Sequence, residues 1–174
     1  MNPLKTFILP VRGLKDGLHE YKFELDSTFF ESVNPETDID ATLTVDLIFD
    51  KRPGMYILEF EVRGSLKADC DRCLEKINIP IDDAHQLYIK QGEAEDEADI
   101  VYLVAFEDHL DISKYVYDYA ILSFPLMNVV ECEEMENPPC NFEMLEKWDD
   151  QDSEDEKKNS IWEQLNNLNL DNKK

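Results

Sequence analysis

The sequence predicts a β-rich α+β fold: an antiparallel sheet or partly open barrel, one packed helix, and an acidic tail ending in a short helix. Three observations support this. Apolar and polar residues alternate over several runs between residues 19 and 89, which is the period of half-buried strands. Residues 112–124 instead carry apolar side chains at helical spacing. From Glu131 onward, acidic residues dominate.

The first elements along the chain are two expected strands, at residues 7–11 and 19–25, where apolar residues alternate with more polar neighbours. Between the second strand and the loop at residues 34–38, the segment 26–30 indicates a short turn or one helical turn. These elements give the N-terminal part of the predicted sheet.

The clearest hairpin joins the alternating runs 41–49 and 56–68, which are separated by a Pro-Gly turn. A third run, 77–89, extends this hairpin into a three-stranded antiparallel meander. Pro80 lies within the third run and indicates an edge strand or a bulge there, because proline cannot donate a ladder hydrogen bond.

The next elements are a short strand and a helix. The continuous apolar run 100–106 is short enough for another buried strand. Asp111 can cap a helix over 112–124, and Pro125 ends that helix because proline removes a backbone donor and restricts the residue before it. The tyrosine-rich stripe of this helix is expected to pack in the core.

The chain divides into a β-rich globular domain (1–130), an acidic cysteine-bearing linker (131–159) and a short amphipathic helix (160–174). A serine and a glutamate at the start of the last segment form a capping box. So short a helix is marginal in water and needs a surface, either on its own domain or on a partner. The residues expected to bind that surface are Trp162, Leu165 and Leu168.

The charge of the chain bears on its partners. The 174 residues carry a formal charge of −23, from 40 acidic and 17 basic residues. Direct nucleic-acid binding is therefore not expected, because phosphate neutralisation needs Lys and Arg. A basic protein partner fits this charge, and so does an acidic surface that only keeps the protein soluble.

No signal peptide and no apolar run of bilayer-spanning length are seen in the sequence, so a cytoplasmic location is expected. Its cysteines are then expected to be reduced or metal-bound rather than paired as disulfides. The state of the four thiols is thus tied to the predicted location.

The four cysteines raise the possibility of zinc. Cys70 and Cys73, spaced C-x2-C, are placed at the tip of the predicted meander, and Cys132 and Cys140 could supply two more ligands for a tetrahedral site. Four reduced, partly packed cysteines are the alternative. A redox C-x2-C is disfavoured, since a thioredoxin-like motif opens a helix in a βαβ unit.

Sequence signatures of enzymes are missing. There are only five glycines, no glycine-rich phosphate loop, and neither an H-E-x-x-H nor a G-x-S-x-G motif. The chain is therefore expected to be a binding protein rather than an enzyme. The alternative is a nuclease-like RNA-processing enzyme, which would need a metal-carboxylate cluster and a basic groove assembled in space.

Four segments of the chain form a pattern in a fixed order. Residues 64–74 (GSLKADCDRCL) are a strand that runs into Cys-x-Arg-Cys-Leu, residues 110–112 (LDI) and 122–126 (LSFPL) mark the limits of the expected helix, a cysteine-bearing segment follows, and residues 160–165 (SIWEQL) begin the closing Trp-containing helix. This order resembles the YceD-like family, the large ribosomal RNA subunit accumulation proteins. The second cysteine pair here, C-x7-C, departs from that family's Gly-Leu-Cys-Pro core.

This resemblance implies a role in the synthesis, processing or stability of large-subunit (23S) ribosomal RNA. We therefore expect a ribosome-assembly factor whose acidic surface holds a basic ribosomal protein or another assembly factor rather than the RNA itself. The resemblance does not imply an enzymatic activity, and zinc is the only cofactor expected.

Overall fold

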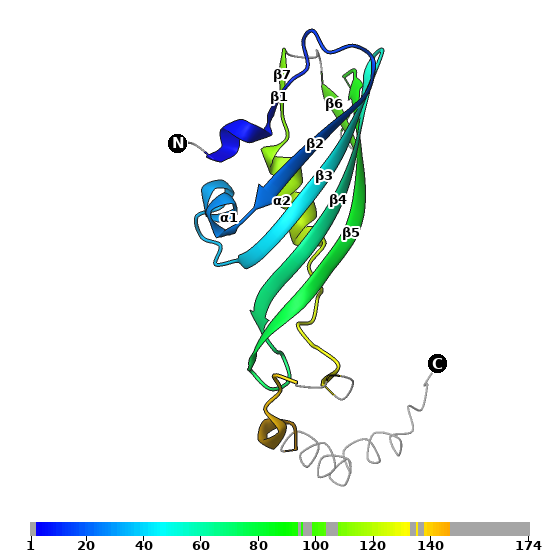
Figure 1. Cartoon of the computed structure of the whole chain (residues 1–174). Coiled ribbons are helices and arrows are strands. Elements are labelled where there is room, and N and C mark those ends of the chain that lie inside the picture. The colour runs from blue at the N-terminus through cyan, green and yellow to red at the C-terminus, as the bar shows by residue number, and fades with distance from the viewer. Residues whose placement is uncertain are drawn as a thin grey trace, which may run out of the picture.

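A long twisted sheet organises the molecule (Figure 1). The computed structural model describes residues 3–93, 95, 99–103, 108–132, 135 and 138–146. Five strands run in the order β2-β3-β4-β5-β6, with bounds β2 Gly17–Leu25, β3 Asp40–Arg52, β4 Met55–Asp69, β5 Lys76–Gln91 and β6 Ile100–Leu103. A separate two-stranded sheet pairs β1 (Ile8–Pro10) with β7 (His109–Asp111).

The expected three-stranded meander is confirmed as β3-β4-β5. Its strands pair antiparallel in continuous register. Residues Asp40 to Arg52 of β3 lie opposite Lys67 to Met55 of β4, and residues Met55 to Asp69 of β4 lie opposite Lys90 to Lys76 of β5. Such long pairing follows from the alternation of apolar and polar residues, because one face of each strand must be buried. The predicted hairpin tip at the two N-terminal cysteines is also confirmed.

The sheet is mixed rather than wholly antiparallel. β6 pairs with the end of β5 in parallel, from Tyr88↔Ile100 to Gln91↔Leu103. Parallel pairing requires a connection that crosses over between the strands, which sequence alternation alone does not report. The sheet does not close into a barrel: among the described strands the order has two ends, β2 and β6, in agreement with the predicted β-rich α+β class.

Helices cover one face of the sheet (Figure 1). Besides the 3-10 helix η1 (Pro3–Phe7), these are α1 (Ser27–Val33), which follows β2, and α2 (Ser113–Leu122), which lies across the sheet. Asp26 caps α1 by accepting from the N–H of Phe29, so the expected single turn is a complete short helix. The expected cap of α2 differs: Ile112 occupies the cap position, and the Asp111 carboxylate accepts from the N–H of Ser113 instead.

The core lies between the sheet and these helices. Every second residue of β3 is buried, and the same holds over most of β4 and β5. The tyrosine-bearing helix contributes Val116, Tyr119 and Ala120, which confirms that its stripe packs in the core. The largest fully buried side chains are Phe30, Phe49, Phe60, Leu9, Leu25, Leu43, Leu47, Leu58, Leu87, Ile89, Ile112 and Val45.

Gly64 allows β3 and β4 to approach closely. Its φ of +152° lies outside the range that other residues adopt easily. A β-carbon at this position would lie 2.8 Å from the Cα of Leu43 and would overlap the carbonyl oxygen of Thr42. Glycine is therefore required by both conformation and space, in the half of β4 that leads to the hairpin tip.

Candidate functional site

The face of the sheet opposite the helices is the first candidate site. We call it the outer face: the alternate residues of β2, β3, β4 and β5 that point away from the core. Acidic side chains predominate on it. They are Glu20, Glu24, Asp40, Asp46, Asp50, Glu59, Glu61, Asp69 and Asp82, against Lys22, Arg52, Arg63, Lys67, Lys76 and Lys90.

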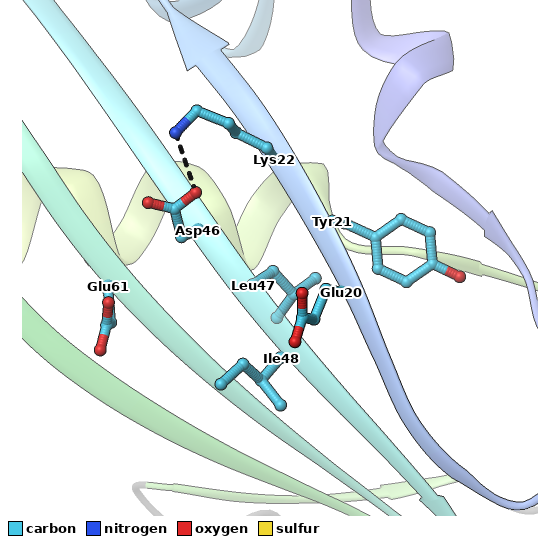
Figure 2. Close-up of a pocket in the computed structure, with 7 residues that line it drawn as sticks. All are labelled: Glu20, Tyr21, Lys22, Asp46, Leu47, Ile48 and Glu61. Atoms are coloured by element: carbon cyan, nitrogen blue, oxygen red, sulfur yellow. Dashed lines mark hydrogen bonds and ion pairs between the residues drawn. The ribbon is translucent and has the colours of Figure 1, made fainter.

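The acidic side chains concentrate at the middle of the outer face. The register places Glu20, Ile48 and Glu59 in one row across the strands, and Asp46 beside Glu61 in the next. A depression of about 390 Å³ lies over these rows. Figure 2 shows the side chains of Glu20 and Ile48 lying together beside it, while Tyr21 points away from them. Ile48 therefore contributes apolar surface to the depression, which Glu20, Asp46, Glu61 and the already paired Lys22 also line.

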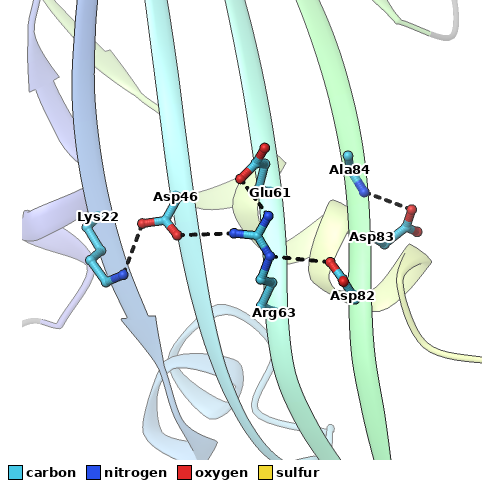
Figure 3. Close-up of polar contacts among 7 residues, drawn as sticks. All are labelled: Lys22, Asp46, Glu61, Arg63, Asp82, Asp83 and Ala84. Atoms are coloured by element: carbon cyan, nitrogen blue, oxygen red, sulfur yellow. Dashed lines mark hydrogen bonds and ion pairs between the residues drawn. The ribbon is translucent and has the colours of Figure 1, made fainter.

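Arg63 joins three strands of the outer face (Figure 3). Its guanidinium lies 2.9 Å from Glu61, 3.4 Å from Asp82 and 3.7 Å from Asp46. The hydrogen bond and the charge of Glu61 raise the pKa of Arg63, with smaller contributions from the other two carboxylates. Lys22 pairs with the other oxygen of Asp46 at 3.1 Å. Both central cations are thus occupied by carboxylates.

Three more cations of this face, Lys67, Arg52 and Lys76, are paired in the same way, the last with Asp69 at 2.7 Å. Lys67 lies 3.3 Å from Asp40, and Arg52 lies 2.6 Å from Asp50. Exposed pairs of this kind contribute little to stability, about 0–1 kcal/mol each, but they neutralise the lysines and arginines that a phosphate backbone would need. The arrangement therefore favours a cationic ligand over an anionic one.

An apolar strip lies beside the acidic rows. Leu18, Ile57 and Tyr88 fall in one row across β2, β4 and β5, with Asp50 of β3 between the first two. Leu18 is 70% exposed, whereas Ile57 is only 8% exposed although it does not belong to the main core. Apolar side chains next to carboxylates suit a ligand that is both cationic and apolar.

The free edge of β5 is less suited to receive a ligand strand. β6 covers only the end of β5, and among the described residues no other strand pairs with the rest of that edge, as Pro80 indicated from the sequence. Pro80 has no backbone N–H that could donate to a ligand strand. The N–H of Ala84 donates to the Asp83 carboxylate at 2.8 Å (Figure 3). The Gln86 carbonyl accepts from the Tyr119 hydroxyl at 3.4 Å. These contacts protect the edge against pairing with another chain.

The hairpin tip is the second candidate site. Cys70 and Cys73 are both buried free thiols. The loop closes through two backbone hydrogen bonds: the N–H of Leu74 donates to the Cys70 carbonyl at 2.9 Å, and the N–H of Cys70 donates to the Glu75 carbonyl at 2.8 Å. Leu74 has a φ of 61°, a left-handed conformation that costs a residue with a β-carbon about 1–2 kcal/mol. The tip is thus a tight, strained turn around two sulfur atoms.

The segment after α2 returns to this tip (Figure 1). Asp71 and Asn128 are joined twice: the Asp71 N–H donates to the Asn128 carbonyl at 2.9 Å, and the Asn128 N–H donates to the Asp71 carboxylate at 2.6 Å. Further along, Asn141 lies near Cys73, and its backbone N–H helps to lower the pKa of that thiol. Cys140 precedes Asn141 and is buried. The fold therefore brings the two sequence-distant cysteine pairs together.

Cys132 and Cys140 form a disulfide in this structure. This differs from the expectation of four reduced or metal-bound thiols. Their Cα atoms are 6.2 Å apart, within the range that a disulfide bridges. With two sulfurs paired, the described residues contain no group of three or more His, Cys, Asp or Glu side chains arranged to hold a metal.

The surroundings of the Cys73 thiol lower its pKa. Burial opposes its ionisation, but the N–H groups of Asn141 and Glu75 and the side chain of Cys70 all donate toward its sulfur. Their combined effect lowers the pKa of Cys73 below its ordinary value. A thiolate is the form of cysteine that binds metals and attacks disulfides.

The side chains of His85, Ser123 and Asp83 are in contact, and these are the three residue types of a Ser-His-Asp hydrolase triad. Such a triad needs the carboxylate at one ring nitrogen and the hydroxyl at the other. Here Ser123 Oγ and Asp83 Oδ2 both lie at His85 Nε2, at 2.9 and 3.3 Å. Ser123 also donates its proton to the Tyr119 carbonyl. The geometry is that of a contact holding the end of α2 to β5.

The sequence identified one of these two sites and missed the other. It singled out the four cysteines, and the structure places them at one end of the sheet. It did not single out the outer face, although the alternation of Glu20, Lys22 and Glu24 already put charged side chains on one side of a strand. The predicted partner-binding residues Trp162, Leu165 and Leu168 lie outside the described residues.

Fold and sites together define an acidic α+β protein with an open carboxylate-rich sheet face and a cysteine-bearing hairpin tip. The family model described as "Large ribosomal RNA subunit accumulation protein YceD" matches residues 58–169, and the chain belongs to this family. The match includes all four cysteines and begins within β4. No curated protein and no solved structure matched the chain.

The family ties the chain to the accumulation of large-subunit ribosomal RNA. In the described part of the chain, no helix has the length and apolar character needed to cross a bilayer.

Proposed function

We propose that this protein supports the accumulation of large-subunit ribosomal RNA in the cytoplasm as a non-enzymatic factor that holds a basic ribosomal protein or assembly factor on its outer face. The family description supports the cellular process in this proposal, the accumulation of large-subunit ribosomal RNA. The observation that carries the proposed contact is the middle of the outer face, where Glu20, Asp46 and Glu61 line a depression beside Ile48 and both central cations are already paired.

The chemistry of this face selects the partner class. A lysine or arginine of the partner would meet Glu20 and Glu59, whose neighbours in the same row are Ile48 and Gln86 rather than cations. One exposed ion pair contributes only about 0.2–1 kcal/mol, so binding would need several such pairs together with burial of the apolar strip. Electrostatic attraction would raise the association rate and make it depend on salt.

The acidic C-terminal segment would extend this capture. Asp149 to Glu156 holds six acids in eight residues, followed by Trp162 and Leu165 at helical spacing. In this proposal the acidic segment attracts the partner from a distance, and the aromatic anchor then buries on it. The competing possibility is that the same apolar residues dock on the protein's own domain.

The test reverses the charge of the face. The variant Glu20→Lys/Glu59→Lys/Glu61→Lys changes three exposed carboxylates of the acidic rows. The matched control, Glu31→Lys/Glu36→Lys/Asp118→Lys, makes the same change in net charge at exposed positions on or near the helices. Each is expressed in cells lacking the wild-type protein, and large-subunit ribosomal RNA is quantified beside the proteins that co-purify.

The proposal expects the outer-face variant to lose its basic partner and to leave ribosomal RNA low, while the control restores both. Equal rescue by the two variants would overturn the outer face as the contact. Co-purification of ribosomal RNA with wild type after the proteins have been removed by high salt would favour direct RNA contact instead.

A further inference from the structure

The edge of β2 that faces away from β3 is one end of the five-stranded sheet. Among the described strands β2 pairs with β3 alone, and Figure 1 shows it along one side of the sheet. We propose that this edge receives an extended segment of the basic partner as an added strand, whose alternate residues are basic on the outer face and apolar on the core side. The inference rests on the proposed function and adds to it the way in which the partner binds.

The first argument is the direction of the backbone groups of β2. In an antiparallel ladder, residues whose side chains share one face all aim their N–H and C=O groups at the same neighbouring strand. Cys70 continues the core-facing set of β4, and its N–H donates to the Glu75 carbonyl just before β5. Because the register is continuous, outer residues of β4 then bond to β3, and core-facing residues of β3 bond to β2. The outer-face residues of β2 therefore aim their backbone groups away from the sheet.

These groups form what we call the free edge: the N–H and C=O of Leu18, Glu20, Lys22 and Glu24. All four residues are exposed, and within the described part of the chain no hydrogen bond engages these backbone groups. The edge of β5 differs, because a proline and two side-chain contacts interrupt it. Proteins use such features to protect sheet edges from pairing. The free edge of β2 lacks them and is available to an added strand.

The second argument is the charge beside the free edge. Glu20 and Glu24 lie on either side of Lys22, which is already paired with Asp46 at 3.1 Å. An added strand places its outer-face side chains about 4.5–5.5 Å from those of β2, so a lysine or arginine would lie opposite each glutamate. A second copy of this chain is disfavoured at the same edge, since each copy carries a formal charge of −23.

The third argument is the apolar surface on the core side of the free edge. Tyr21 is half-buried, and its ring extends past β2 on the side away from β3 (Figure 2). The ring stacks on Phe23 at a centroid distance of 6.4 Å, and Phe23 stacks on Phe7 at 4.9 Å. An apolar side chain of the added strand would be buried against Tyr21. A segment of alternating basic and apolar residues therefore matches both sides of the edge.

The experiment measures the binding of two synthetic peptides to the full chain by fluorescence anisotropy. One peptide alternates lysine and valine over the length of β2, and the other has the same composition with every lysine before every valine. The variant Lys22→Pro removes one N–H of the free edge, whereas the control Lys22→Thr removes the same charge and keeps that N–H. An edge proline leaves the bonds between β2 and β3 in place, and circular dichroism establishes that each variant is folded.

Amide hydrogen exchange, followed by NMR, reads the same contact in the wild type without any substitution. Binding of the alternating peptide should slow exchange of the four amides of the free edge. Asn78 and Asp82 lie on either side of Pro80 at the edge of β5, and their amides should exchange as before. Slowing at the β5 edge instead of the β2 edge would overturn the inference.

We expect the wild type to bind the alternating peptide more tightly than the block peptide. Lys22→Thr should bind it at least as tightly, because a cation beside the peptide's lysines is removed, whereas Lys22→Pro should bind it about 10-fold or more weakly than Lys22→Thr. Equal affinity for the two peptides, or for the two variants, would overturn the added strand.

Co-purification from cells separates this inference from the proposed function. If Lys22→Pro keeps the basic partner that Glu20→Lys/Glu59→Lys/Glu61→Lys loses, the added strand is wrong and the outer face remains the contact. If Lys22→Pro loses the partner while Lys22→Thr keeps it, the added strand is supported.

Discussion

Replacing Gly64 by alanine should destabilise the protein far more than replacing a glycine in a turn. The new β-carbon would overlap the carbonyl oxygen of Thr42 and lie 2.8 Å from the Cα of Leu43, and both atoms belong to the backbone of the neighbouring strand. Backbone cannot move aside as a flexible side chain can, so β3 and β4 would have to separate. The unfavourable φ of +152° adds to this cost.

The magnitude follows from these two contributions. A residue held in a sparsely allowed conformation costs about 1–3 kcal/mol, and forcing extra volume into a packed contact costs about another 1–3 kcal/mol. We therefore expect Gly64→Ala to lower the free energy of unfolding by about 4 kcal/mol. For a chain of this size that corresponds to a fall in Tm of about 8–16 °C.

The matched control is Gly54→Ala. Gly54 also has a positive φ, of 75°, but a β-carbon there would meet nothing within 4 Å. Only the conformational cost applies, about 1–2 kcal/mol. Urea denaturation followed by circular dichroism gives both values. Equal destabilisation by the two substitutions would refute the close approach of β3 and β4 as the reason for glycine at position 64.

Three further predictions concern single side chains. Asp26→Ala should lower the free energy of unfolding by about 1 kcal/mol, because it removes the cap of α1. Hydrogen bonding to Thr28 lowers the pKa of Asp26, so the stability that the wild-type carboxylate contributes is present above the ordinary aspartate pKa of 3.8 and is lost as pH falls below it. The urea midpoints of variant and wild type should therefore converge in acid. Burial raises the pKa of Tyr119 to about 12, so the stability that its neutral hydroxyl contributes is present below pH 10.0 and is lost as pH rises toward 12. Tyr119→Phe should therefore reduce the fall in the free energy of unfolding over this alkaline range. The same fall in variant and wild type would contradict the prediction. Trp162→Ala should weaken partner recovery in pull-downs and leave Tm nearly unchanged, whereas a loss on the order of 3 kcal/mol with normal recovery would show that Trp162 docks on its own domain.

The sequence alone predicted the strands and the main helix well, because their signals are local. Alternation in β3, β4 and β5 defined the meander, and helical spacing defined α2, since each pattern depends only on near neighbours along the chain. The C-x2-C at the hairpin tip followed from its position between two such runs. The parallel pairing of β6 and the full length of α1 were not predicted, because tertiary contacts decided them.

Only the tertiary structure decided how the two candidate sites are assembled. The sequence placed Glu20, Asp46 and Glu61 on strands, but the cross-strand register that gathers them around one depression depends on pairing between distant segments. In the same way, the contact of Asn141 with Cys73 joins residues far apart in the chain. Local periodicity determines which residues can share a face. Long-range packing determines which faces meet, because it depends on burying the whole core at once.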